Sequence, residues 1–213
     1  MPSGKYFNTE GLCRPGLHYM ADTSAKIDAI VCDYIERGRY FVINRARQYG
    51  KTTTLELLNE KLSDRYLVLS LSFEGREEYF QSFKALVTGV SSQIQQRLRE
   101  IQPALSAVFE LAIVDQIPMD VLDSRITQLC VESDKPVVLM IDEVDRASDY
   151  IVFASLLGIL RTKYLKRKTL ENRTTFHSVI LAGVHDIKNL KARIRQDSEH
   201  SYNSPWNIAA DFS

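Results

Sequence analysis

The 213-residue sequence has few cysteines and no excess of charge of either sign. The three cysteines, Cys13, Cys32 and Cys130, are far apart, and none has a histidine beside it. This spacing excludes a Cys/His zinc site and a disulfide framework, so we expect buried free thiols. Lysine plus arginine and aspartate plus glutamate number 27 each. The net charge therefore gives no reason to expect nucleic acid or an anionic membrane as a partner.

Long hydrophobic runs are missing as well. The longest one, IVFASLLGIL at residues 151–160, is about half of the ~20 residues that cross a bilayer. The N-terminal segment MPSGKYFNTEGLCRPGLHYM has no apolar stretch typical of a signal peptide. We therefore predict a cytoplasmic protein without a membrane partner. The length and the 45% of hydrophobic residues are enough for one sizeable core and too little for two domains of comfortable size.

Segments with helical and strand patterns alternate along the chain. Short apolar runs predict strands, and apolar positions recurring every three or four residues predict helices between them. This order predicts an α/β fold in three layers, α/β/α, with a mostly parallel sheet. The expected strands are 40–43, 66–73, 137–141 and 178–182. The expected helices are 23–37, 104–111, 119–130, 150–164, a short basic one after 182, one that passes through Leu55, Leu58 and Leu62, and a long one that ends before Pro103 and carries Phe80, Phe83, Val87, Val90, Ile94, Leu98 and Ile101 on one stripe.

Residues 44–54, NRARQYGKTTT, lie between a predicted strand and a predicted helix. Strand, tight loop and helix N-terminus in this order form the phosphate loop of P-loop NTPases. Lys51 would bind the β- and γ-phosphates, Thr52 would ligate Mg²⁺, and Gly50 would let backbone amides approach the phosphates. The alternative is a surface turn in which Thr52 or Thr53 caps the helix. The residues expected to contact nucleotide are Arg45, Ala46, Arg47, Gln48, Tyr49, Gly50, Lys51, Thr52 and Thr53.

A second motif, VVLMIDEVD at residues 137–145, is an apolar strand that ends in acids. In a P-loop NTPase the acid at this position, here Asp142, holds Mg²⁺ together with the threonine of the loop. The next carboxylate, Glu143, is placed to activate the attacking water, so Glu143 and Lys51 are the predicted catalytic residues. Acids also follow strands simply because loops are solvated. Two motifs in the right order, each at a strand end, favour the NTPase interpretation over chance.

The sequence resembles the bacterial AAA-ATPase-like proteins, in the group that includes archaeal-type and STAND ATPases. The resemblance covers nearly the whole chain, through the two motifs above and the segments FNTEGLCRPGLHYM (7–20), SVILAGVHDIKNL (178–190) and SPWNIAADF (204–212). Members of this group often carry Arg-x-Arg-x-Phe/Tyr-Gly-Lys-Thr. The resemblance thus explains Arg45, which stands where other phosphate loops have glycine.

The resemblance implies binding of ATP and Mg²⁺ and hydrolysis assisted by Glu143. It also implies a polar sensor beside the nucleotide after the 178–182 strand, where the matching residues are His185 and Asp186, and a lead-in that places His18 or Tyr19 near the base. Relatives continue into a helical lid, whereas this sequence ends at Ser213. We expect a lead-in segment packing on the core at 1–22 and a P-loop ATPase core at 23–213, with the lid and C-terminal domains absent.

Ten basic residues crowd positions 161–195, against only Glu171 and Asp186. They predict either a nucleic-acid patch or a solvated basic face, and without an aromatic stacking platform the second is favoured. The preferred function is a Mg²⁺-dependent ATPase that serves as a switch or motor module of a larger protein, with a homo-oligomer or a protein as partner. The alternatives are a non-catalytic nucleotide-binding or interaction module without a lid, and a nucleic-acid-associated ATPase.

Overall fold

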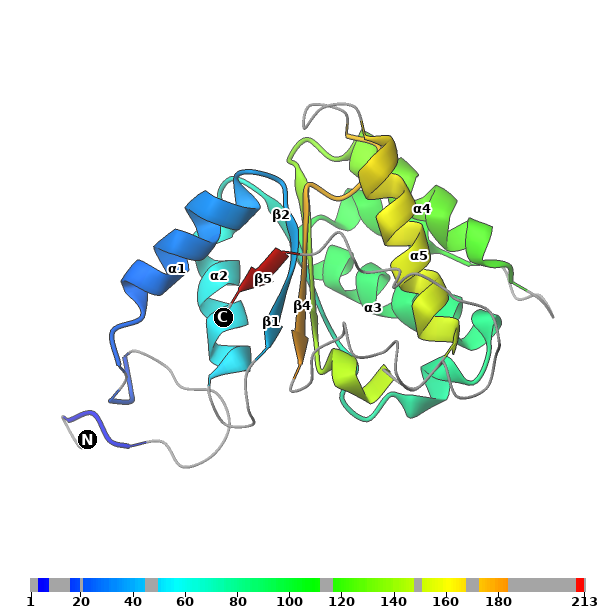
Figure 1. The fold of residues 1–213 in the computed structure, drawn as a ribbon. Helices are drawn as coiled ribbons and strands as arrows, with labels where there is room; N and C mark the ends of the chain where they lie inside the picture. The colour runs from blue at the N-terminus through cyan, green and yellow to red at the C-terminus, as the bar shows by residue number, and fades with distance from the viewer. Residues whose placement is uncertain are drawn as a thin grey trace.

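The structure is a computed structural model that describes residues 4–7, 16–19, 21–44, 50–111, 117–147, 151–167, 173–183 and 210–212. Its centre is a sheet of five strands, with helices on both faces (Figure 1). The strand order is β2-β3-β4-β1-β5, and every neighbouring pair is parallel. The strands are β1 (Tyr40–Asn44), β2 (Leu67–Ser72), β3 (Val137–Asp142), β4 (Ser178–Gly183) and β5 (Ala210–Phe212).

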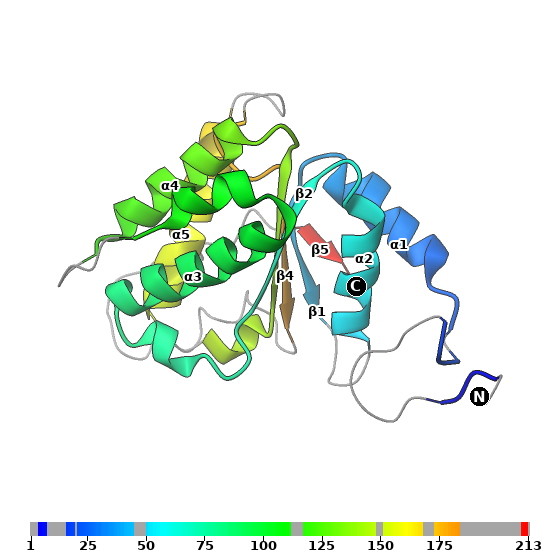
Figure 2. The ribbon, with the colours of Figure 1, turned by 180° about the vertical axis from the view of Figure 1, so that it is seen from behind.

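Two helices cover one face of the sheet and three cover the other (Figures 1 and 2). On the first face lie α1 (Ser24–Ile30) and α2 (Lys51–Leu62). On the second lie α3 (Phe83–Ile101), α4 (Met119–Glu132) and α5 (Ile151–Lys166). The three-layer α/β/α fold with a parallel sheet is therefore confirmed. Shorter helical segments are η1 (Val31–Ile35), η2 (Glu77–Phe80), η3 (Pro103–Phe109) and η4 (Val144–Ala147).

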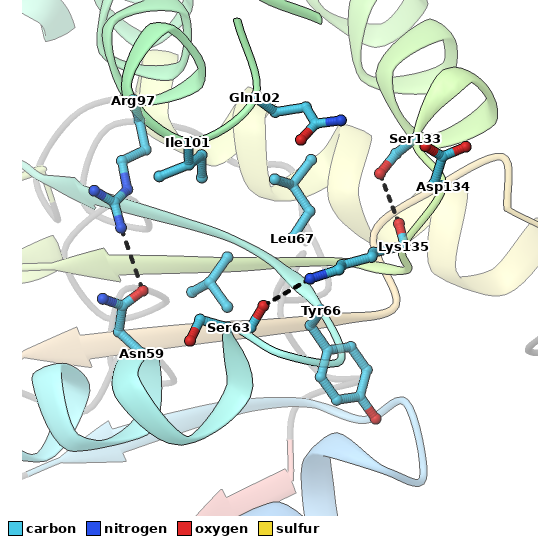
Figure 3. A pocket seen from close by; sticks show the side chains of 11 residues that line it. Asn59, Ser63, Tyr66, Leu67, Arg97, Ile101, Gln102, Ser133, Asp134 and Lys135 are labelled. Carbon is cyan, nitrogen blue, oxygen red and sulfur yellow. Dashed lines mark hydrogen bonds between the residues drawn. The ribbon is translucent and has the colours of Figure 1, made fainter.

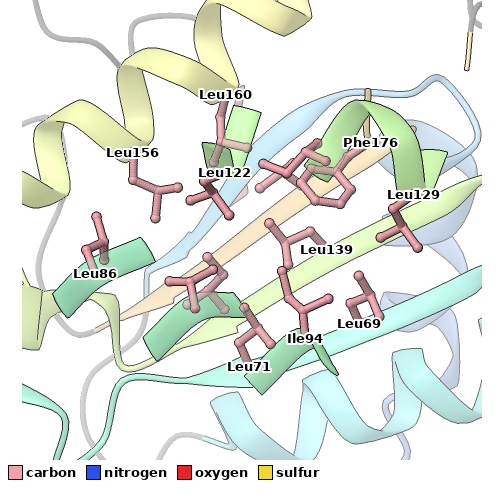
Figure 4. Close-up of a cluster of buried hydrophobic side chains, with 14 of the residues drawn as sticks. Leu69, Leu71, Leu86, Ile94, Leu122, Leu129, Leu139, Leu156, Leu160 and Phe176 are labelled. Atoms are coloured by element: carbon pink, nitrogen blue, oxygen red, sulfur yellow. The ribbon is translucent and has the colours of Figure 1, made fainter. Parts of the chain in front are cut away.

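Each face of the sheet has its own hydrophobic core. The larger core fills the space between the sheet and α3, α4 and α5 (Figure 4), and the smaller lies beneath α1 and α2. All six residues of β3 and of β4 are buried, because both strands are interior and are covered on both faces. This burial explains why their sequences are apolar runs without alternation.

The first helical segment, predicted at 23–37, runs from Ser24 to Ile35 and changes its winding along the way. The N-cap of α1 is Thr23, and the Asp22 carboxylate just before it accepts hydrogen bonds from the Ser24 amide at 2.9 Å and the Ser24 hydroxyl at 2.6 Å. After Ile30 the α-helix continues as the π-helical turn η1, and the chain reverses at Gly38, whose φ is 61°. The hydrogen bond from the Ser24 hydroxyl, and next the one from the Ser24 amide, lower the pKa of the Asp22 carboxyl.

Two sequence-based expectations were wrong, and one strand was missed. Phe83, expected on the buried stripe of its helix, is 46% exposed at the first position of α3, and the buried residue there is Phe80 of η2. Cys32 is exposed on η1, whereas Cys130 is buried as expected, and burial raises the pKa of its thiol to about 12. The strand β5, which pairs with β1, was not predicted. The short basic helix expected after residue 182 lies outside the described residues.

Several basic side chains of the 161–195 segment make internal contacts. Lys163 forms an ion pair with Asp123 at 3.3 Å. Arg167 donates to the backbone oxygens of His177 and Gly38 and lies 4.1 Å from the centre of the Tyr164 ring. Arg173 donates to the carbonyl oxygens of Ser133 and Asp134, just after α4. These contacts tie α5 and the β3–β4 connection to the sheet, which disfavours a nucleic-acid patch built from these side chains.

Candidate nucleotide site

The site lies where the carboxyl ends of the central strands meet the N-terminus of α2. The registers align Ser72 with Asp142 and Asn44 with Gly183, so these strand ends lie at one edge of the sheet. In an open parallel α/β sheet this edge is where ligands bind. The fold thus brings the two sequence motifs, far apart along the chain, to one place.

Gly50, the N-cap residue immediately before α2, has a left-handed conformation, with φ 71° and ψ 28°. An L side chain rarely adopts this conformation, which explains the glycine immediately before the helix. The Gly50 carbonyl accepts hydrogen bonds from both the amide and the hydroxyl of Thr54, each at 2.8 Å. These two bonds fix the first turn of α2, whose first residue, Lys51, is only 6% exposed.

The central contact of the site joins the two motifs directly. The Thr52 hydroxyl donates to Asp142 Oδ2 at 2.8 Å, across 90 residues of sequence. The other carboxylate oxygen, Asp142 Oδ1, accepts the Glu143 amide at 2.8 Å. Asp142 is 8% exposed, so these two bonds hold its carboxylate in one orientation. A hydroxyl and a carboxylate so placed are a pair of hard oxygen ligands of the kind that Mg²⁺ prefers.

Glu143 has an unusual backbone for a residue with a side chain. Its φ is 56°, in the left-handed region. That conformation costs a residue other than glycine of order 1–3 kcal/mol, and residues that adopt it are common at functional sites. Burial, followed by the nearby Asp145 and Asp142 carboxylates, raises the pKa of Glu143, while Lys51 and Arg146 act in the opposite direction. The net effect makes this carboxylate a better proton acceptor than an exposed glutamate.

Two residues around Glu143 have roles that the sequence alone did not reveal. Arg146 Nε lies 3.7 Å from Glu143 Oε2, a contact that the three-residue spacing in the turn η4 allows. Gly183 ends β4 so close to η4 that a Cβ there would lie 2.8 Å from Asp145 Oδ1 and 3.1 Å from Val144 Cγ2. A glycine at the end of β4 therefore leaves the room that the acidic turn occupies.

A third residue missed from the sequence is Lys26 of α1. Its ammonium donates to the Thr54 hydroxyl at 3.5 Å and so lies beside the first turn of α2. No local pattern in the sequence indicates which neighbouring helix Lys26 meets. Lys26 and Lys51 put two positive charges near the positive end of the α2 dipole, a place suited to an anion.

Other predicted site residues fall outside the described part of the chain. These are the loop residues 45–49 and both sensor candidates, His185 and Asp186. Of the lead-in, Tyr6 pairs with His18 through a parallel β-bridge, and their rings meet edge to face with centroids 4.8 Å apart. Tyr19 is 56% exposed and lies against Phe7, with ring centroids 5.0 Å apart. The roles expected for His18, Tyr19 and the lead-in remain predictions.

The chain is similar to known proteins in its three-dimensional structure. No protein-family model matches the sequence, and no curated protein matches it. Among solved structures, the ORC2 protein of Aeropyrum pernix, solved as ADPNP and ADP complexes, is similar with a TM-score of 0.57 and 13% identity over 84% of this chain. Cdc6p of Pyrobaculum aerophilum is similar with a TM-score of 0.52 and 15% identity over 92%.

These similarities define the class of fold. The chain has a parallel α/β fold like that of the matched parts of these ORC2 and Cdc6p structures. It spans 44% and 46% of the length of these two structures. No helix among the described ranges is long and apolar enough to cross a membrane.

Proposed function

We propose that the protein binds ATP with Mg²⁺ and hydrolyses it, as the P-loop ATPase part of a switch or motor. The observation that carries the proposal is the 2.8 Å hydrogen bond between Thr52 and Asp142. If Thr52 belonged only to a surface turn and Asp142 only to a solvated loop, nothing would require the two side chains to be in contact. Two residues that bind the same Mg²⁺ must lie together. The fold supports the proposal, because one structure with a similar fold holds ADPNP and ADP.

Each residue of the site has a chemical task in this proposal. Lys51 and the amides at the start of α2 bind the phosphates and neutralise their charge. Thr52 and Asp142 would hold Mg²⁺, which when bound supplies further charge neutralisation on the phosphate oxygens. The remaining residues expected to touch nucleotide are Arg45, Ala46, Arg47, Gln48, Tyr49, Gly50, Thr53 and His185.

Glu143 performs the proton transfer in this mechanism. Its carboxylate accepts a proton from water while the water oxygen attacks the γ-phosphorus in line with the leaving oxygen of ADP. The bond to that oxygen breaks, and ADP and inorganic phosphate result. The raised pKa of Glu143 supports this role, since a general base works best when its pKa approaches the working pH.

Calorimetry of ATP binding, with and without Mg²⁺, tests the binding half of the proposal. Lys51→Ala should weaken binding by about 1.5–3 kcal/mol, which is roughly 10- to 150-fold in Kd. Lys61→Ala is the matched control, because Lys61 lies on the same helix but pairs with Asp28 on the surface. Equal affinities of the wild type and the Lys51 variant would overturn the assignment of the loop.

Phosphate release tests the hydrolytic half. Glu143→Gln should lower kcat by a factor of about 10²–10⁴, as expected when a general base is removed, while ATP still binds. Undiminished turnover would refute the role of Glu143. Metal-dependent ATP binding without turnover in the wild type would instead support the non-catalytic alternative. The specific observation favouring that alternative is the Arg146 contact, which engages the Glu143 carboxylate.

A further inference from the structure

The free edge of the sheet carries a feature that the nucleotide site does not use. β2 is the terminal strand in the order β2-β3-β4-β1-β5. The amides of Leu67 and Phe73 donate toward β3 and its flanks. Because strand residues alternate in direction, the backbone groups of Val68, Ser70 and Ser72 face away from β3. A row of outward-facing backbone N–H and C=O groups is a template on which another strand can pair.

A groove follows this edge between α2 and α3. Its wider part, about 600 Å³, runs from the nucleotide site along Ser70 and Ser72. Its narrower part, about 280 Å³, continues past Val68 to Tyr66 and Lys135 (Figure 3). Val68 is buried beneath α2, whereas Ser70 and Ser72 are small and exposed, which leaves the groove open beside the strand. From residue 67 to 72 the edge is ~17 Å long, the length of about five extended residues.

The groove already contains an amide that pairs with the edge as a strand would. The Gln93 side chain of α3 accepts the Ser72 amide hydrogen and donates to the Ser72 carbonyl, both at 3.0 Å. The next positions along the edge, Ser70 and Val68, have no strand partner among the described residues. Over this stretch Arg97 of α3 donates to Asn59 of α2 at 3.4 Å, across the groove (Figure 3). That distance is beyond the usual 2.7–3.2 Å, so the bond is weak and easily opened.

The charges of the groove indicate what kind of segment fits. Besides Asp142 and Glu143 of the nucleotide site, the wider part is lined by three carboxylates and one guanidinium, and that guanidinium, of Arg97, is already paired with Glu100 at 3.0 Å. The narrower part is lined by the same Arg97 and by Asp134 and Lys135. Nucleic acid and anionic lipid would be repelled from the wider part. Its three further carboxylates are Glu56, Glu74 and Glu100.

We propose that this groove binds an extended, basic peptide segment of a partner protein, which adds a strand to the edge of β2. Its backbone pairs with Ser70 and Val68 next to the Gln93 amide and displaces the bond between Arg97 and Asn59. Its lysine or arginine side chains lie among Glu56, Glu74 and Glu100. The main-chain bonds supply affinity and the carboxylates supply specificity, as in other cases of strand addition. This inference does not depend on ATP hydrolysis.

Selection from a phage library of random octapeptides on the intact protein, in the absence of nucleotide, tests the proposal. We expect enrichment of sequences with basic residues at alternating positions and no central proline. The best one, made as a fluorescent peptide, should bind with an anisotropy change and slow hydrogen exchange at the Ser70 amide. Enriched peptides without basic residues, or an unchanged Ser70 amide, would overturn the proposal.

Variants separate this groove from other surfaces. Ser70→Pro removes only an outward amide, a change that edge strands tolerate, and should abolish binding. Glu56→Lys should weaken it at least roughly three-fold, near the upper range for exposed ion pairs, whereas Glu132→Lys on α4 is the control and should not. Asn59→Ala removes the Arg97–Asn59 bond across the groove and should tighten binding. Circular dichroism verifies folding, and equal affinity of the folded Glu56 and Asn59 variants and the wild type would refute the groove as the site.

Discussion

Gly89 lies in the middle of α3, a position at which glycine ordinarily weakens a helix. In this structure it makes room for the ring of Tyr79. A Cβ at Gly89 would lie 2.6 Å from three atoms of the Tyr79 ring, well below the 3.4 Å at which ordinary contact begins. Tyr79 belongs to η2, which connects β2 to α3 and packs on the larger core. The ring of Tyr79 therefore occupies the space left by the missing side chain.

Two opposing terms set the effect of Gly89→Ala on the free energy of unfolding. Alanine gains about 1 kcal/mol of helix propensity over glycine. Forcing a methyl group against the ring costs about 1–3 kcal/mol. We therefore expect a net loss of up to about 2 kcal/mol. In a Tyr79→Ala background the clash is absent, and the same substitution should stabilise by about 1 kcal/mol.

Urea unfolding followed by circular dichroism measures both signs. Gly158→Ala is the matched control, because Gly158 is interior to α5 and a Cβ there would meet nothing within 4 Å. It should stabilise by about 1 kcal/mol, the propensity term alone. If Gly89→Ala stabilises the wild type as much as Gly158→Ala does, the steric reasoning is refuted.

Three further predictions concern the site and the cores. Thr52→Val should abolish the Mg²⁺ dependence of ATP binding in calorimetry, and a retained dependence would exclude Thr52 as a ligand. Leu58→Ala, at a fully buried position, should cost about 2–5 kcal/mol in urea unfolding, while Leu165→Ala, 56% exposed, should cost far less. Burial lowers the pKa of His177 below its usual 6.5, so the unfolded chain takes up a proton first as pH falls. Stability should decline below about pH 6.5, and His177→Gln, which cannot titrate, should flatten that decline.

Much of the fold follows from local patterns in the sequence. The interior strands β3 and β4 are apolar runs bounded by polar residues, so their position and burial were predictable. The helix α2 was predictable from Leu55, Leu58 and Leu62 at helical spacing. By contrast, β5 is only three residues long and forms because β1 offers an edge. No local pattern contains that information.

The candidate site divides in the same way. The sequence predicted Lys51, Thr52, Asp142 and Glu143 as site residues, because phosphate and metal chemistry require those residue types at a helix start and a strand end. It did not identify Arg146, Gly183 or Lys26. Arg146 contacts Glu143 only because of the turn η4, and Gly183 and Lys26 matter through neighbours on other elements.

By itself, the sequence determined the order of the first four strands and of the helices between them, the apolar faces that form the two cores, and the chemical types of the two motifs. These depend on residue spacing along the chain, which sequence records directly. The tertiary structure alone decided the strand order, and with it the meeting of Thr52 with Asp142 and the exposure of β2 at the edge between α2 and α3. These features depend on how distant segments pack. Hydrophobic burial favours every arrangement that covers the apolar faces, and only the complete set of contacts selects one of them.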